Sequence, residues 1–268
     1  MDAQGGASGR AARGVTAGPG ISLPPGRLPP GPVAVILAED GSALAETVAH
    51  CRKLGFAAIV LLRPPGLALG AGEGVIEIDT TLRGREGAAA ALNALHAPLS
   101  GRWLHFCFNA EFLIYPYFET RGVADLISFM EEERRQAVFA TLLDLYAGED
   151  GVPDAVAMAE PLFDGCGYYG FTRSFGEAEA ERWTEVYGGL RWRYEEFVPE
   201  DRRRIDRPGL YLAHAGLTID ADFRLSDPEL NTVSCPWHHN VTAAVASFRA
   251  AKALRSNPRS AGIGSLAW

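Results

Sequence analysis

Two short polar segments carry residue types that could do chemistry, and each directly follows an apolar run. Glu39 and Asp40 follow the first apolar run of the chain, and Asn109 and Glu111 follow an apolar run that opens at Trp103. A carboxylate beside a buried run needs a polar partner, which indicates a site role for Glu111. For Glu39 and Asp40, capping of a helix and contact with a ligand are equally good interpretations.

Basic and imidazole side chains form two further candidate sites. Arg191 and Arg193 alternate with Trp192 after a pair of glycines. This pattern fits a loop that lets the backbone approach a ligand, and it also fits an ordinary turn with exposed charges. His238 and His239 are adjacent, so on an extended segment they point in opposite directions and at most one faces a site.

The elements that must position these residues begin with a strand, a helix and a strand. The apolar run 33–38 predicts a buried strand, and 57–62 predicts a second. Between them, Asp40 or Ser42 can cap a helix that Gly55 ends. This order of elements is a βαβ unit.

The alternation of strands and helices continues to about residue 108. It comprises a strand over 75–78, a helix over 86–96 and a strand over 103–108. We therefore expect an α/β fold with a mostly parallel sheet flanked by helices. Ligands of such sheets bind beyond the carboxyl ends of the strands. Here these ends are marked by Glu39 with Asp40, by Arg63, by Asp79 and by the segment 108–111.

The second half of the chain is less regular. The pattern predicts a helix over 123–133, a mixed apolar stretch over 138–146 and a glycine- and aromatic-rich region over 161–194. A last helix is predicted over 240–256, with Val241, Val245 and Phe248 as its apolar stripe.

Composition bounds the function. The chain has 268 residues, 47% of them hydrophobic, and a formal charge of −8. The acidic balance argues against nucleic acid or an anionic membrane as the main partner. Residues 1–32 hold 8 of the 30 glycines and 6 of the 17 prolines and are predicted to be a disordered tail, before a domain over 33–256 and a C-terminal tail over 257–268. With four dispersed cysteines, no signal sequence and no transmembrane segment, we expect a cytoplasmic protein.

Several segments, taken in order, resemble the bacterial family-two-like glycosyltransferases, which have the nucleotide-diphospho-sugar transferase fold called GT-A. The similarity spans residues 33–256. The matching segments are Ala38-Glu39-Asp40, Glu46 to His50, Leu54-Gly55-Phe56, Asn93, Trp103, Phe163-Asp164 with Gly167-Tyr168, Gly188 to Arg193, and His238-His239. The resemblance implies a GT-A-like sheet, a nucleotide-activated sugar as donor and a glycan acceptor. It also implies that Asp164 is the catalytic base.

The chain departs from this family at the metal motif. The family has Asp-x-Asp-Glu-Phe-Leu, whose two aspartates hold a divalent ion, but here Phe108 and Ala110 replace both aspartates. If a metal site is retained, Glu111 with His238 or His239 would hold Mn²⁺ or Mg²⁺. Otherwise no cofactor is expected.

The resemblance places the donor near Glu39 and Asp40, with help from further polar residues. These are Arg63, Asn109, Glu111, Arg191 and Arg193. Basic side chains could stabilise the leaving diphosphate without a metal. The remaining departures are Ala38, where the family has a basic residue, and the Arg63-Pro64-Pro65-Gly66 loop.

The sequence is compatible with three functions. The first is a glycosyltransferase that is weakly active or independent of metal. The second is a catalytically inactive pseudo-glycosyltransferase that binds or scaffolds, acting beside an active partner glycosyltransferase. The third, a dinucleotide-binding oxidoreductase, ranks below both, because Ala38-Glu39-Asp40-Gly41-Ser42 stands where a Gly-x-Gly-x-x-Gly turn is needed.

Overall fold

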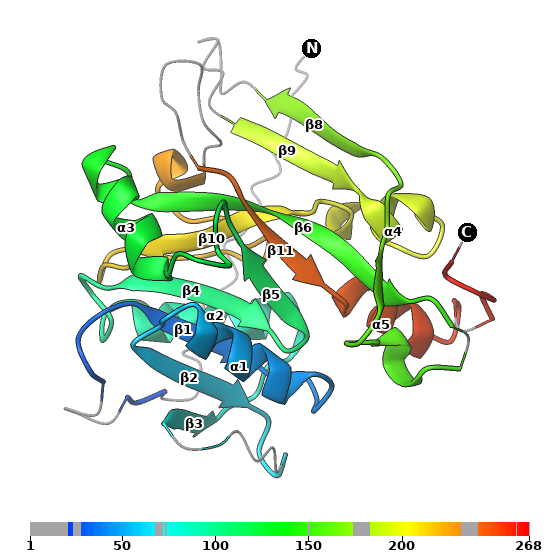
Figure 1. Ribbon diagram of the computed structural model, residues 1–268, viewed down its shortest axis with the longest axis horizontal. Coiled ribbons are helices and arrows are strands. Elements are labelled where there is room, and N and C mark those ends of the chain that lie inside the picture. Colours follow the sequence, from blue (N-terminus) through cyan, green and yellow to red (C-terminus); the bar gives the residue numbers. More distant parts are fainter. Residues whose placement is uncertain are drawn as a thin grey trace, which may run out of the picture.

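The computed structural model describes residues 21–23, 28–67, 72, 74–149, 151–173, 183–231, 241–260 and 262–267. Most described strands join one large sheet flanked by helices (Figure 1). The order across this sheet is β3-β2-β1-β4-β10-β6-β11-β5, and β7 pairs with β6. The strands of this sheet are β1 (Val33–Leu37), β2 (Ala58–Arg63), β3 (Val75–Asp79), β4 (Trp103–Phe108), β5 (Glu111–Ile114), β6 (Ala137–Ala147), β7 (Pro161–Phe163), β10 (Asp206–Leu212) and β11 (Ala243–Ser247).

The α/β class is confirmed, but the sheet as a whole is mixed rather than mostly parallel. Strands β1 to β4 pair in parallel, as predicted for the first half. Strand β10 then runs antiparallel to both β4 and β6, and β5 runs antiparallel to β11. Only Asn109 and Ala110 separate β4 from β5 along the chain, yet β5 pairs with β11 at the far edge of the sheet and not with β4.

The helices cover both faces of the sheet. Helix α1 (Leu44–Lys53) and α3 (Val123–Glu132) pack in one hydrophobic core with the side chains of one strand face, while α2 (Gly84–His96) packs in a second core with the opposite face. Successive residues of β1 alternate between the two cores, Ala34 in the first and Val35 in the second. A strand buried on both faces explains its continuous apolar run.

The remaining described elements are a two-stranded ribbon and several short helices. A two-stranded ribbon is formed by β8 (Tyr168–Arg173) and β9 (Trp183–Gly188) and leads into α4 (Gly189–Arg193). Three short 3₁₀ helices, η1 (Pro153–Ala155), η2 (Glu200–Arg202) and η3 (Pro228–Asn231), and the helix α5 (Arg249–Ser256) complete the described elements.

The prediction of one helix over 240–256 is wrong in its first half. Residues Ala243–Ser247 form strand β11, and α5 begins only at Arg249. Strand β11 lies between β6 and β5. Its apolar run was too short for periodicity to distinguish a buried strand from a helix. Residues 232–240 lie outside the described part.

The predicted cap of α1 is also wrong in its details. The N-cap residue is Ala43, in a left-handed conformation and without a side-chain cap. Asp40 instead accepts a hydrogen bond from the Ser42 amide. The predicted end at Gly55 holds, since Gly55 follows the helix with φ +85°.

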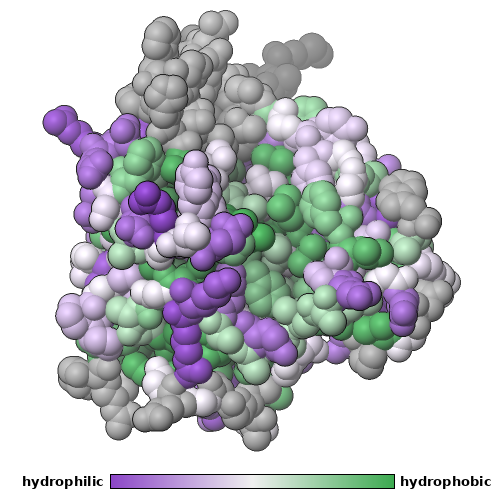
Figure 2. All heavy atoms as spheres, viewed as in Figure 1, coloured by the Kyte–Doolittle hydropathy of each residue, from purple (hydrophilic) through white to green (hydrophobic). Residues whose placement is uncertain are grey.

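Parts of both predicted tails that the structure describes pack on the domain. Ile21, Leu23 and Leu28 contact the core beneath α2, and Leu266 is buried against α5. Hydrophilic and hydrophobic residues are interspersed on the face shown in Figure 2. No helix among the described residues has the length and apolarity needed to span a membrane.

Candidate functional site: a basic pocket

A pocket of about 520 Å³ lies where α2, α4, η2 and α5 approach the carboxyl end of β1. We call it the basic pocket. Its volume falls within the range of small-molecule sites, about 300 to 1,000 Å³. The charged residues that line it are Glu39, Asp40, Arg85, Arg191, Arg202, Arg249 and Lys252. Five cations against two anions make this pocket cationic in a chain whose formal charge is −8.

Asn109 joins the ends of the two central parallel strands at this pocket. Its side-chain oxygen accepts a hydrogen bond from the Glu39 amide at 2.8 Å, and its side-chain nitrogen donates to Asp40 at 2.7 Å and to the Ser42 carbonyl at 3.0 Å. Strands β1 and β4 are neighbours, with Leu37 opposite Phe108. Asn109, fully buried, therefore fixes the loop that carries Glu39 and Asp40.

Both acidic residues of the pocket hold a cation of α5. The Arg249 guanidinium donates to both carboxylate oxygens of Glu39, at 3.0 and 2.7 Å, and Lys252 Nζ lies 2.7 Å from Asp40 Oδ2. Arg249 also lies over the Phe108 ring, with Cζ 3.6 Å from its centroid. Although burial alone would lower it, the pKa of Arg249 is raised because the carboxylates of Glu39 and Glu111 favour the cation.

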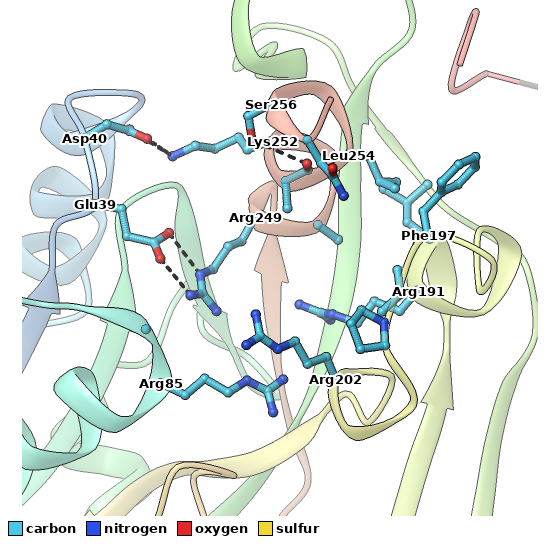
Figure 3. Close-up of a pocket in the computed structure, with 17 residues that line it drawn as sticks. Glu39, Asp40, Arg85, Arg191, Phe197, Arg202, Arg249, Lys252, Leu254 and Ser256 are labelled. Atoms are coloured by element: carbon cyan, nitrogen blue, oxygen red, sulfur yellow. Dashed lines mark hydrogen bonds and ion pairs between the residues drawn. The ribbon is translucent and has the colours of Figure 1, made fainter. Parts of the chain in front are cut away.

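The remaining cations approach from the opposite walls. Figure 3 shows the guanidinium groups of Arg85, Arg191, Arg202 and Arg249 directed toward one another across the pocket. Burial lowers the pKa of Arg85 to about 10, and the positive charges of Arg191, Arg249 and Arg202 contribute to the shift against the opposing effect of Asp222. Like charges that line one pocket repel one another, so the pocket favours an anionic ligand.

Arg191 is held in place by a fully buried carboxylate. Asp144, on β6, lies 3.4 Å from Arg191 and accepts a hydrogen bond from the Leu190 amide at 3.0 Å. Gly189 precedes them with φ +62°, and a Cβ there would lie 2.7 Å from Asp144 Oδ2. Glycine is therefore needed where α4 begins. Burial raises the pKa of Asp144, and the nearby Asp164 adds to this effect while Arg191 opposes it.

Glu111, the acid that remains of the predicted metal motif, is buried and does not line the pocket. Its side chain is 0% exposed and forms an ion pair of 2.6 Å with Arg207. It also accepts hydrogen bonds from the Phe108 amide and the Ser247 hydroxyl. Burial opposes ionisation, but Arg207 and Arg249 outweigh it and lower the pKa of Glu111.

The residues at the positions of the predicted metal motif do not fit a divalent cation. Both oxygens of Glu111 and the oxygen of Asn109 accept protein hydrogen bonds, and Arg249 covers Phe108. Ala110 is buried in a left-handed conformation. Within the described ranges, no three His, Cys, Asp or Glu side chains are arranged to hold a metal ion. His238 and His239 lie outside the described residues.

Three other residues predicted to bind the donor or to act in catalysis do not line the basic pocket, namely Arg63, Asp164 and Arg193. Arg63 forms ion pairs with Glu77 and Asp79 on β3. Asp164 is fully buried, 3.0 Å from Arg193. Of the seven predicted donor residues, the structure thus brings Glu39, Asp40 and Arg191 to the pocket, with Asn109 and Glu111 behind its wall.

Sequence reasoning missed four cations of the pocket, Arg85, Arg202, Arg249 and Lys252. A signal for two of them was present. Arg249 and Lys252 are three residues apart directly after an apolar run, and this spacing places both on one helix face. The interpretation of that run as helix concealed that they follow the end of a strand, where α/β sheets bind ligands.

Comparison with known proteins adds no family to this description. No protein-family model matches the chain, and no curated protein sequence matches it.

Proposed function

We propose that the chain binds a nucleotide-activated sugar with its diphosphate in the basic pocket and transfers the sugar to a glycan acceptor. The observation that carries this proposal is the convergence of four guanidinium groups and one ammonium group on one pocket beside the strand ends. A diphosphate is a compact anion with several acceptor oxygens, and arginine can bind it with paired hydrogen bonds. The sugar and the acceptor come from the sequence resemblance.

The same cations suit the chemistry of transfer. The bond between the sugar and the diphosphate breaks, a bond from the sugar to the acceptor hydroxyl forms, and a base takes the hydroxyl proton. The leaving diphosphate gains negative charge as this happens. Fixed positive groups stabilise that charge without reorganising at the moment of reaction.

Binding without transfer is the second candidate, and the position of Asp164 favours it. The residue predicted to be the base is fully buried and paired with Arg193 at 3.0 Å. A carboxylate so placed has no contact with solvent and would have to leave Arg193 to reach an acceptor hydroxyl.

One set of measurements tests both candidates. Calorimetric titration with a panel of uridine and guanosine diphosphate sugars should give saturable binding to one of them. Release of the nucleoside diphosphate in the presence of glycan acceptors would then identify a transferase. Binding with no release would identify the non-catalytic protein, whereas no binding by any donor would contradict the proposal.

A further inference from the structure

In the resemblance to the glycosyltransferases, Phe108 occupies the position of the first aspartate of the metal motif. A cation, the Arg249 guanidinium, packs against its ring. The Arg249 guanidinium centre lies 3.6 Å from the centroid of the Phe108 ring. Attraction between a guanidinium and an aromatic face holds such a group in place. The ring thus supports a positive charge at the position where an aspartate would have supported a metal ion.

The backbone explains why Arg249 reaches this position. Strand β11 pairs with β5 so that Ser247 lies opposite Glu111, and the Phe248 amide donates to the Ala110 carbonyl at 3.1 Å. Helix α5 therefore starts directly beside the turn between β4 and β5. Its first residue, Arg249, is delivered to the end of β4 by the sheet itself.

Two carboxylates, those of Glu39 and Glu111, also stabilise the positive charge of Arg249. Glu39 accepts two hydrogen bonds from it, and the charge of Glu111 raises its pKa further. The Arg249 side chain remains 24% exposed and lines the basic pocket. It is thus anchored on one side and open to a ligand on the other.

We infer that Arg249 takes the place of the divalent cation, so that diphosphate binding in this pocket depends on Arg249 and not on a metal ion. This inference rests on the proposed function. It makes Phe108 a positioning residue for the guanidinium and gives Glu39 a role in holding it. On this view the Arg249 guanidinium supplies the positive charge that a metal ion held by the two aspartates would have supplied.

The test is calorimetric titration of uridine diphosphate and guanosine diphosphate into the full chain, in EDTA and in Mn²⁺. For wild type, affinity should agree within about twofold between the two conditions. Arg249→Gln should weaken binding by about 10- to 100-fold, since a hydrogen bond to a charged group contributes about 1.5 to 3 kcal/mol. Arg249→Lys keeps the charge but lacks the planar guanidinium, so its affinity should lie between those of wild type and Arg249→Gln.

Two further variants separate this role from general effects. Arg259→Gln removes the same charge from an exposed residue beyond α5 and should leave affinity unchanged. Phe108→Leu keeps an apolar side chain but removes the ring, and should weaken binding about threefold or more. If Arg249→Gln does not fold, Arg249→Lys and Phe108→Leu carry the test.

The outcomes distinguish the inference from the proposed function. Binding that requires Mn²⁺, or an Arg249→Gln variant that binds as well as wild type, would overturn the inference and leave nucleotide binding in place. If neither nucleotide binds in either condition, the proposed function and the inference both fall.

Discussion

At the residue scale, Glu111 stabilises the fold, although the sequence predicted it to be a metal ligand. It is fully enclosed, paired with Arg207 at 2.6 Å, and bonded to the Phe108 amide and the Ser247 hydroxyl. The Arg207 guanidinium in turn lies over the Phe106 ring. This cluster ties β4, β5, β10 and β11 together behind the basic pocket.

We predict that Glu111→Gln lowers the free energy of unfolding by about 3 kcal/mol, because it leaves the buried Arg207 without its counter-charge. Urea denaturation measures the change. The matched control is Glu195→Gln, whose carboxylate is 56% exposed and pairs with Arg203; it should cost at most about 1 kcal/mol. Equal, small effects would mean that the buried pair contributes little.

The same pair predicts a dependence on pH. The pKa of Glu111 is lowered in the folded chain, with Arg207 and Arg249 overcoming the effect of burial. The stability it contributes is therefore fully present above its unfolded pKa, and is lost as pH falls through the lowered folded value. The difference in unfolding free energy between wild type and Glu111→Gln should shrink steadily below about pH 4. A difference that stays constant into acid would contradict this assignment.

At the element scale, the strands and helices up to β4 could be predicted from the sequence because each gives a strong local signal. The βαβ unit from Val33 onward has continuous apolar strands and a glycine at the helix end. Strand β11 could not be predicted in this way, since its five residues acquire their strand character from pairing with β5 and β6. Such pairing joins segments more than 90 residues apart, which local periodicity does not contain.

The candidate site divides in the same way. Glu39 and Asp40 could be predicted because they follow a strand end, and Arg191 because it follows a glycine pair. Arg85 and Arg202 could not, because each lies on a surface element whose position relative to β1 is set by the tertiary fold. Their charges form a site only once four separate segments meet.

Helix α4 depends on a glycine, and this gives a test at the element scale. Gly189→Ala adds a Cβ 2.7 Å from Asp144 Oδ2 at φ +62°, and should lower the free energy of unfolding by about 2 to 4 kcal/mol. Gly55→Ala is the control, because φ is also positive there but no atom lies within 4 Å; it should cost about 1 to 2 kcal/mol. Denaturation midpoints for the two variants decide the matter, and an equal loss would show that the contact with Asp144 is relieved at little cost.

At the scale of the whole molecule, an acidic chain concentrates positive charge in one pocket. Burial lowers the pKa of Arg85, and the positive charges of Arg191, Arg249 and Arg202 lower it further. Repulsion among these cations opposes folding. Clusters that cost stability and serve binding are common at functional sites, where stability and activity trade against each other.

We therefore predict that Arg202→Gln stabilises the fold even though it weakens binding of an anion. The free energy of unfolding should rise, by up to about 1 kcal/mol in low salt, because repulsion is relieved. The gain should diminish in about 1 M salt, where the screening length is only about 3 Å. Thermal and urea unfolding at the two salt concentrations measure it. A loss of stability in low salt would indicate that Arg202 supports the fold instead.

The central claim is that the basic pocket is built to bind a diphosphate. The most direct test is calorimetric titration of inorganic pyrophosphate, in EDTA, into the wild-type protein and into a double variant that carries both Arg85→Gln and Arg202→Gln. We expect saturable one-to-one binding to wild type and affinity at least about 30-fold weaker in the double variant, from two lost charged contacts. No saturable binding to wild type, or equal affinity in both proteins, would contradict the account.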